Sequence, residues 1–157
     1  MTVVLGKIKD FSCNYYLMSA IVAWIVAQII KIFTGLYQHG DKKTLTKILF
    51  STGGMPSSHS ASMLALTVSL GLGEGFNSPM FAVAAVLSII VMMDASGVRY
   101  ETGKQSAFLN KVAKEMFSGK PELVNVAFKE FVGHTPFQVF MGAALGVTVG
   151  IVMFFIF

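Results

Sequence analysis

Charged side chains are scarce in this sequence. Asp, Glu, Lys and Arg make up 13% of its 157 residues and hydrophobic residues make up 54%, whereas about a quarter of an ordinary soluble domain is charged. Four stretches contain none of these four residue types: 11–30, 57–73, 76–93 and 136–157. A soluble helical bundle needs a polar face on its outer helices, and these stretches leave almost none for water. The scarcity therefore argues against a soluble bundle.

The four stretches have the length of membrane spans. Each is about 17–22 residues long, and a helix needs roughly 17–25 apolar residues to cross a bilayer. Backbone polar groups in lipid must be satisfied within the segment, so each span should be a helix. We predict an all-α integral membrane bundle, a single domain over 1–157, with four transmembrane spans at about 11–33, 57–73, 76–94 and 136–157. Lys31 comes directly after the first stretch, and no small-residue cleavage site follows it. This pattern is typical of a span that stays in the mature protein.

Other absences narrow the class of protein. A single cysteine, Cys13, excludes a disulfide within the chain. No segment resembles a nucleic-acid-binding module, and the net charge of +4 favours contact with anionic lipid. Three histidines and Asp94 lack the tight spacing that recommends a metal site. We expect no metal, no cofactor and no nucleic-acid partner, and the sequence leaves open whether the chain forms a homo-oligomer.

Lys and Arg are distributed unevenly between the two membrane faces. Four spans would place the connections 31–56 and 94–135 on the same face. Ten of the twelve basic residues then lie there: Lys31, Lys42, Lys43, Lys47, Arg99, Lys104, Lys111, Lys114, Lys120 and Lys129. The positive-inside rule predicts a multi-pass protein of the cell membrane with both long connections in the cytoplasm and both termini outside. Lys7 and Lys9, on the other face, argue weakly against this orientation.

The second connection is amphipathic. Its apolar residues recur at helical spacing in two groups separated by Pro121: Leu109, Val112, Ala113, Met116 and Phe117, then Leu123, Val126, Ala127 and Phe131. This spacing predicts two amphipathic helices at the membrane interface within about 104–131. Packing of the two helices on each other as a small cap is an equally good interpretation.

Polar residues gather where the second span begins, in the segment GGMPSSHSASM at 53–63. A helix N-terminus carries unpaired N–H groups and a partial positive charge, which together form an anion site. Ser57 and Ser58 would add hydroxyl donors, Gly54 a backbone N–H, and His59 a group that titrates near neutrality. The alternative is ordinary helix capping by serine, with His59 at the headgroup level.

Further polar groups should reach the same face. Lys31 ends the first span, Arg99 and Lys104 follow the third, and His134 precedes the fourth. Singly, each cation is explained by snorkelling or by the positive-inside bias. Together, cations and two histidines at one depth are what phosphoryl transfer requires, because cations hold the phosphate oxygens while one imidazole attacks and the other protonates the leaving oxygen.

The strings STGGMPSSHSA, DASGVR, GKQ and GHTP carry a family resemblance that covers the chain from about residue 28 onward. The chain resembles a divergent four-span branch of the type 2 phosphatidic acid phosphatase and vanadium haloperoxidase superfamily. The resemblance implies a metal-independent membrane enzyme that hydrolyses a phosphate monoester or diphosphate on a lipid, phosphatidate-like or polyprenyl-type, through a phosphohistidine.

The resemblance also assigns roles to residues. It implies that His134 is the nucleophile and His59 the general acid. It implies that the phosphate is bound by Lys31, Ser57, Ser58 and Arg99, with Lys104 as a further candidate. Two features depart from the superfamily pattern: Gln138 stands where an aspartate orients the nucleophilic histidine, and Arg99 and His134 lie far apart in the chain.

The missing carboxylate leaves two interpretations open. Gln138, four residues after His134, could accept the imidazole N–H, but an amide cannot stabilise an imidazolium as a carboxylate does. Asp94 ends an uncharged span at a helix C-terminus, where the helix dipole disfavours an anion, and could take the role instead. The alternative for Asp94 is a local salt bridge to Arg99.

The sequence thus predicts a membrane lipid phosphatase with His134, His59 and Asp94 as catalytic residues and Gln138 as an orienting residue. The other hypothesis is a non-catalytic membrane protein that binds anionic lipid or a partner and retains a degraded phosphatase site. Transfer of the phosphoryl group to an alcohol in place of water is a third.

Overall fold

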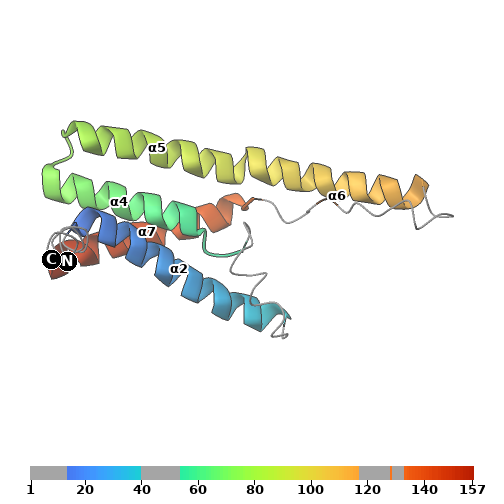
Figure 1. Cartoon of the computed structure of the whole chain (residues 1–157), viewed down its shortest axis with the longest axis horizontal. Coiled ribbons are helices and arrows are strands. Elements are labelled where there is room, and N and C mark those ends of the chain that lie inside the picture. Colours follow the sequence, from blue (N-terminus) through green and yellow to red (C-terminus); the bar gives the residue numbers. More distant parts are fainter. Residues whose placement is uncertain (1–13, 40–53, 117–127, 129–132) are drawn as a thin grey trace, which may run out of the picture.

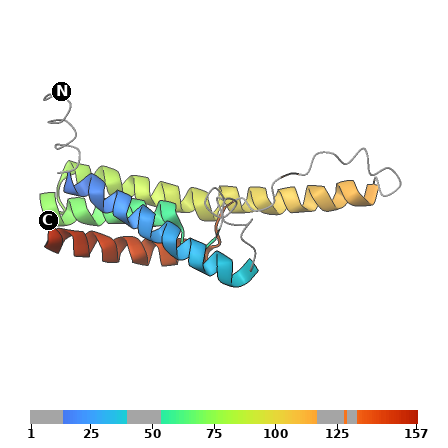
Figure 2. The same ribbon diagram turned by 60° about the horizontal axis from the view of Figure 1, so that its bottom comes forward.

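A computed structural model of the chain describes residues 14–39, 54–116, 128 and 133–157. Its elements are all helices: α2 (Tyr15–His39), α4 (Ser58–Glu74), α5 (Pro79–Ser96), α6 (Val98–Met116) and α7 (Pro136–Ile156). No strand occurs among the described residues, which confirms the all-α prediction. Helices α2, α4, α5 and α7 lie side by side in one bundle, with α4 between the other three (Figures 1 and 2).

Three segments of the described residues are long and apolar enough to cross a membrane: Tyr15–Thr34, Pro79–Met116 and Pro136–Ile156. The predicted second span corresponds to α4, which has 17 residues. At about 1.5 Å per residue this helix is about 25 Å long, slightly less than the hydrocarbon core of a typical bilayer. Three spans are therefore supported by length and composition, and a fourth through α4 stays a prediction.

Polar caps set where three of the helices begin. The hydroxyl of Ser57 accepts from the Ser60 N–H at the start of α4, and that of Ser78 accepts from the Phe81 N–H at the start of α5. Thr135 and Gln138 form a capping box at the start of α7. Such caps satisfy N–H groups that have no partner inside the helix. The sequence therefore specifies these helix starts through short local motifs.

Small residues form the centre of the bundle. The buried hydrophobic cluster consists of Ala23 and Ala27 on α2 with Ala61 and Ala65 on α4, while large apolar side chains such as Phe33, Phe140 and Phe155 are exposed. This distribution is the reverse of a soluble core, and it is the arrangement that helices adopt in lipid, where small residues allow close backbone approach.

Helices α4 and α7 run parallel and are joined by a glycine stripe. Gly142, Gly146 and Gly150 recur every four residues on α7, and all are buried. A Cβ at Gly146 would collide with the carbonyl oxygen of Ala61, and one at Gly142 with that of Ser57. The two helices therefore pack backbone against backbone, as in small-xxx-small membrane pairs. This contact sets the register between the start of α4 and the start of α7.

Helix α6 continues the direction of α5 beyond the bundle (Figures 1 and 2). Backbone hydrogen bonds run through the junction, from the Gly97 N–H to Met93 and from the Glu101 N–H to Gly97. The first predicted amphipathic helix is present, but it starts at Val98 and extends α5 instead of turning away from it. The second predicted helix falls outside the described residues apart from Phe128, whose backbone N–H and C=O pair with the side chain of Asn110. The interfacial position of both remains a prediction.

Candidate functional site

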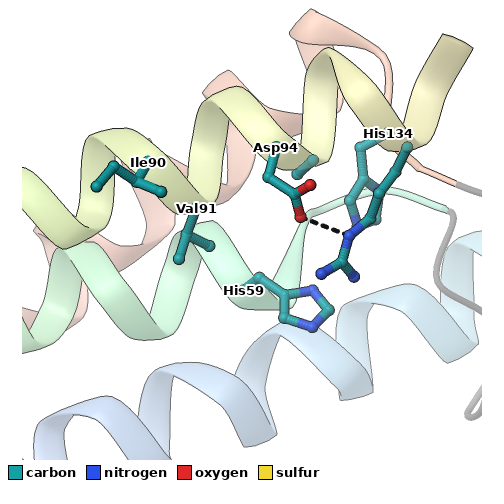
Figure 3. A pocket seen from close by; sticks show the side chains of 7 residues that line it. His59, Ile90, Val91, Asp94 and His134 are labelled. Atoms are coloured by element: carbon teal, nitrogen blue, oxygen red, sulfur yellow. Dashed lines mark hydrogen bonds and ion pairs between the residues drawn. The ribbon is translucent and has the colours of Figure 1, made fainter.

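The predicted polar residues converge at the end of the bundle where α4 and α7 begin and α5 ends. A pocket of about 230 Å³ lies there. Its lining residues come from α4, α5, the start of α6 and the segment before α7: His59, Ile90, Val91, Asp94, Ala95, Arg99 and His134 (Figure 3).

Hydrogen bonds between segments distant in sequence hold this end together. The Ser57 N–H donates to the carbonyl of Gln138 at 3.1 Å, which ties α4 to α7. The His134 N–H donates to the carbonyl of Ala95 at 2.9 Å, which ties the approach to α7 to the last turn of α5. Two histidines far apart in the chain are thereby anchored to one scaffold.

Gly133 allows the chain to reach this position. Its φ is +92°, a left-handed conformation that residues with a side chain adopt rarely, and a Cβ there would collide with the backbone of Arg99 and Tyr100. The glycine thus brings His134 against the junction of α5 and α6. This close approach explains how Arg99 and His134 meet although 35 positions separate them in the sequence.

His134 is buried, and polar groups of Gln138 and Gly54 lie close enough to its ring to raise its pKa slightly against the effect of burial. It is 2% exposed, and neither ring nitrogen has a hydrogen-bond partner among the described residues. Burial is the main reason that the pKa of His134 is lowered from 6.5 to about 4, and the positive charge of Lys31 acts in the same direction. His134, which precedes the α7 span, is therefore a neutral imidazole at physiological pH, with a nitrogen lone pair available.

His59 faces His134 from the first turn of α4. The two ring centroids are 6.3 Å apart and the rings are inclined at 59°, so the imidazoles are too far apart for a direct hydrogen bond. His59 is exposed, and its ring lies between α5 on one side and α2 on the other (Figure 3). One imidazole is thus shielded and the other accessible, with space between them.

Two cations approach the site in different ways. Lys31, near the end of the α2 span, is 3% exposed, and Gly54 lies against its side-chain carbons. Arg99 Nε donates to Asp94 Oδ2 at 2.5 Å, and both side chains remain partly exposed. The Asp94–Arg99 salt bridge considered from the sequence is therefore present, and both side chains line the pocket.

The serines are buried at the start of α4. Ser57 is 0% and Ser58 2% exposed. The Ser57 hydroxyl accepts from the N–H and the hydroxyl of Ser60, so it acts as a helix cap, as the simpler interpretation of this segment proposed. Beside them, Thr34 Oγ1 donates to the carbonyl of Met55 and joins the end of α2 to this segment.

Lys104 does not take the position that was expected of it, and Gln138 caps a helix in addition to lying close enough to His134 to raise the pKa of its ring. Lys104 lies on α6 outside the pocket, where its ammonium donates to Glu101 and lies over the Tyr100 ring. The Gln138 carbonyl oxygen accepts from the Thr135 N–H in the capping box. His134 precedes the helix, so the shared helix face assumed for residues 134 and 138 does not form. Asp94 likewise points to Arg99, and no hydrogen bond joins it to either histidine.

Sequence reasoning missed the apolar wall of the pocket, which consists of Ile90, Val91 and Ala95 on α5. A signal was present, since Ile90 lies four residues before Asp94 and so shares its helix face. Within the described ranges no cluster of three His, Cys, Asp or Glu side chains could hold a metal ion.

Comparisons with known proteins identify the family of this chain. The model of the divergent PAP2 family matches residues 12–149. An uncharacterised membrane protein of Bacillus subtilis strain 168, YuiD, is 35% identical over 154 residues, which cover 92% of this chain and 96% of that protein. No solved structure matches the chain. With most of its length matched, the resemblance seen in the sequence is confirmed, and the chain belongs to the divergent PAP2 family.

Proposed function

We propose that the protein is a membrane lipid phosphatase that hydrolyses a phosphate monoester or diphosphate through a phosphohistidine. The observation that supports this most strongly is the pairing of a buried imidazole, His134, whose nitrogens have no hydrogen-bond partner in the described part of the chain, with an accessible imidazole, His59, across one small pocket. A buried polar group without a partner costs stability, so its retention favours a chemical role. Membership of the divergent PAP2 family supports the same class of reaction.

The reaction proceeds in two displacements. Neutral His134 attacks phosphorus, an N–P bond forms, the P–O bond to the lipid breaks, and protonated His59 gives its proton to the leaving oxygen. A water molecule then attacks the phosphohistidine while His59 takes a proton from it. The N–P bond breaks, inorganic phosphate leaves, and both imidazoles return to their starting states.

The cations and helix starts bind the phosphoryl group. Arg99 and Lys31 would hold its nonbridging oxygens, with the backbone N–H groups at Gly54 and at the start of α4 as further donors. Ser58 is a candidate donor beside them. Lys104 is left out of the clamp because its ammonium pairs with Glu101. This scheme uses no metal.

Phosphate release from purified protein in detergent tests the proposal. The His134→Asn variant should lose at least about 10²-fold in turnover, because a covalent nucleophile is removed. Vanadate, which mimics pentacoordinate phosphorus, should inhibit the wild type, and chelators should leave its rate unchanged. His39→Asn, which changes a histidine that has no role in the proposed mechanism, is the matched control and should retain normal turnover.

A normal rate in His134→Asn would rule out the phosphohistidine. Trapping of radiolabelled phosphate on the wild type, stable to base and labile to acid, would support it directly. The same trapping in the His134→Asn variant would place the nucleophile elsewhere.

A second candidate function is non-catalytic binding of an anionic lipid or a partner. The carboxylate of Asp94 is engaged by Arg99 and the side-chain oxygen of Gln138 by the helix cap, so neither carboxylate nor cap oxygen is hydrogen-bonded to His134. Under this hypothesis the wild type releases no phosphate from any lipid phosphate, yet binds vesicles that contain phosphatidate. Weakened vesicle binding in Lys31→Gln would then identify the site as a lipid receptor.

A further inference from the structure

The pocket has a polar end and an apolar end, and the two ends lie at different positions along α5. Along α5, Ile90 and Val91 precede Asp94, and His134 lies beyond Asp94 toward α6 (Figure 3). His59 lies between these ends, with Val91 pointing toward it. The polar groups therefore face the headgroup end of the bundle, and the apolar wall lies one turn deeper in the span.

The positions of the polar and apolar ends determine how a substrate must lie, because the reaction is an in-line displacement. The attacking and leaving atoms lie on opposite sides of phosphorus. If His134 attacks from the headgroup end, the leaving oxygen points toward His59 and the wall formed by Ile90 and Val91. The carbon atoms attached to that oxygen then contact hydrocarbon immediately.

This wall discriminates between two kinds of lipid phosphate. A glycerolipid carries ester or hydroxyl oxygens within a few bonds of the leaving oxygen. The side chains of Ile90, Val91 and Ala95 have no hydrogen-bonding group, so those oxygens would be desolvated without partners. A prenyl or alkyl alcohol presents only carbon at the same positions and gains from contact with the wall.

The tail also has a route out of the pocket. Helix α5 packs on α4 and α7, and α2 packs on α4 and α7, with His59 accessible between α2 and α5. Ile90 is 55% exposed on the outer surface of α5. A long chain can therefore leave the pocket past Ile90 and continue along the outside of the bundle within the bilayer.

We infer that the apolar end of this pocket selects the monophosphate of a single-chain hydrocarbon alcohol, prenyl or alkyl, over any glycerolipid phosphate. Ile90 and Val91 are the residues that determine this specificity. The inference rests on the proposed phosphatase function and adds the substrate class to it.

Two single-chain substrates test whether polar atoms beside the phosphate reduce the rate of hydrolysis. Octadecyl phosphate and oleoyl lysophosphatidate each carry one long chain, but only the second has glycerol and ester oxygens beside the phosphate. In the same micelles the wild type should hydrolyse octadecyl phosphate with a kcat/KM at least about tenfold higher. Farnesyl phosphate should behave like octadecyl phosphate, and dioleoyl phosphatidate like the lysolipid.

Two tryptophan variants at adjacent positions test whether the apolar wall contacts the substrate. Ile89 and Ile90 are adjacent and exposed to 54% and 55%, but only Ile90 lines the pocket. Ile90→Trp should lower kcat/KM for octadecyl phosphate about tenfold or more by filling the apolar end, with vanadate affinity by calorimetry unchanged. Ile89→Trp should leave both quantities unchanged.

The outcomes separate the two ideas. Equal hydrolysis of octadecyl phosphate and lysophosphatidate, or equal effects of the two tryptophan variants, would overturn the substrate class and leave the phosphatase function intact. Loss of vanadate binding in Ile90→Trp would also overturn it, because Ile90 would then support the phosphate site itself. Absence of phosphate release from every substrate would refute the phosphatase function, and this inference with it.

Discussion

His134 combines two properties that seldom occur in one side chain, complete burial and the lack of a hydrogen-bond partner for its ring nitrogens among the described residues. Gly133 and the carbonyl of Ala95 hold its backbone, so the ring is positioned by main-chain contacts and not by a carboxylate. The pKa of the ring, lowered to about 4 by burial, keeps it neutral without such a partner. A glutamine at position 138, where the family resemblance leads one to expect an aspartate, is therefore compatible with the proposed role of His134 as a neutral nucleophile.

This lowered pKa predicts how His134 titrates. In histidine-labelled protein in micelles, the His134 ring should stay neutral from pH 7 down to about pH 5, with His134→Asn used to assign its signals. The unfolded chain takes up a proton near pH 6.5 and the folded one only near pH 4. The free energy of unfolding should therefore fall as pH is lowered through this window, and His134→Asn should weaken that dependence. A His134 midpoint near 6.5 would contradict its burial.

At the scale of elements, the contact between α4 and α7 positions the site. Gly142 lies against Ser57, at the start of the helix that carries His59, and Gly146 lies one turn further along against Ala61. The same register brings the Ser57 N–H to the carbonyl of Gln138. A change in the spacing of these helices would move His59 relative to His134.

Enlarging one glycine should therefore affect stability and turnover together. Gly146→Leu would force α7 away from the backbone of α4 and should destabilise the folded protein by about 1–3 kcal/mol or more. Ala144→Leu, on the exposed face of the same helix, is the matched control and should change little. Thermal unfolding in detergent measures both variants. Equal unfolding temperatures would show that the two helices do not pack through the glycine stripe.

At the scale of the whole molecule, the site and the turn between α4 and α5 lie at opposite ends of the bundle (Figure 1). Helix α6 carries four basic residues at the site end, of which Arg99 lines the pocket and Lys104, Lys111 and Lys114 lie further along the helix. The positive-inside rule assigns that end to the cytoplasm if α4 crosses the membrane as the fourth span. The phosphatase site would then act on lipids of the inner leaflet.

Cysteine labelling in intact cells tests this orientation. In a Cys13→Ala background, Lys111→Cys should be protected from an impermeant maleimide and Asn77→Cys should react, because both side chains are exposed but at opposite ends of the bundle. Labelling of both after permeabilisation is the control. The reverse pattern would place the site on the outer face. Reaction at both positions in intact cells would mean that α4 does not span the membrane.

Local features of the sequence were sufficient to predict the helices. The uncharged stretches overlap α2, α4, α5 and α7, and the serine cap expected where the second span begins is present at Ser57, because helical hydrogen bonds and caps join residues that are near in the chain. The same reasoning placed His59, His134, Lys31 and Arg99 at one end of the bundle from span order alone.

Three side-chain pairings are local. Asp94 pairs with Arg99, Lys104 with Glu101, and the Gln138 side-chain oxygen with the Thr135 N–H, each three to five residues away. The sequence offered the first of these as an alternative. What the tertiary structure decided is which residues meet across the bundle. The burial of His134 and the apolar wall at Ile90 depend on contacts between segments far apart in the chain, so only the packed bundle determines them.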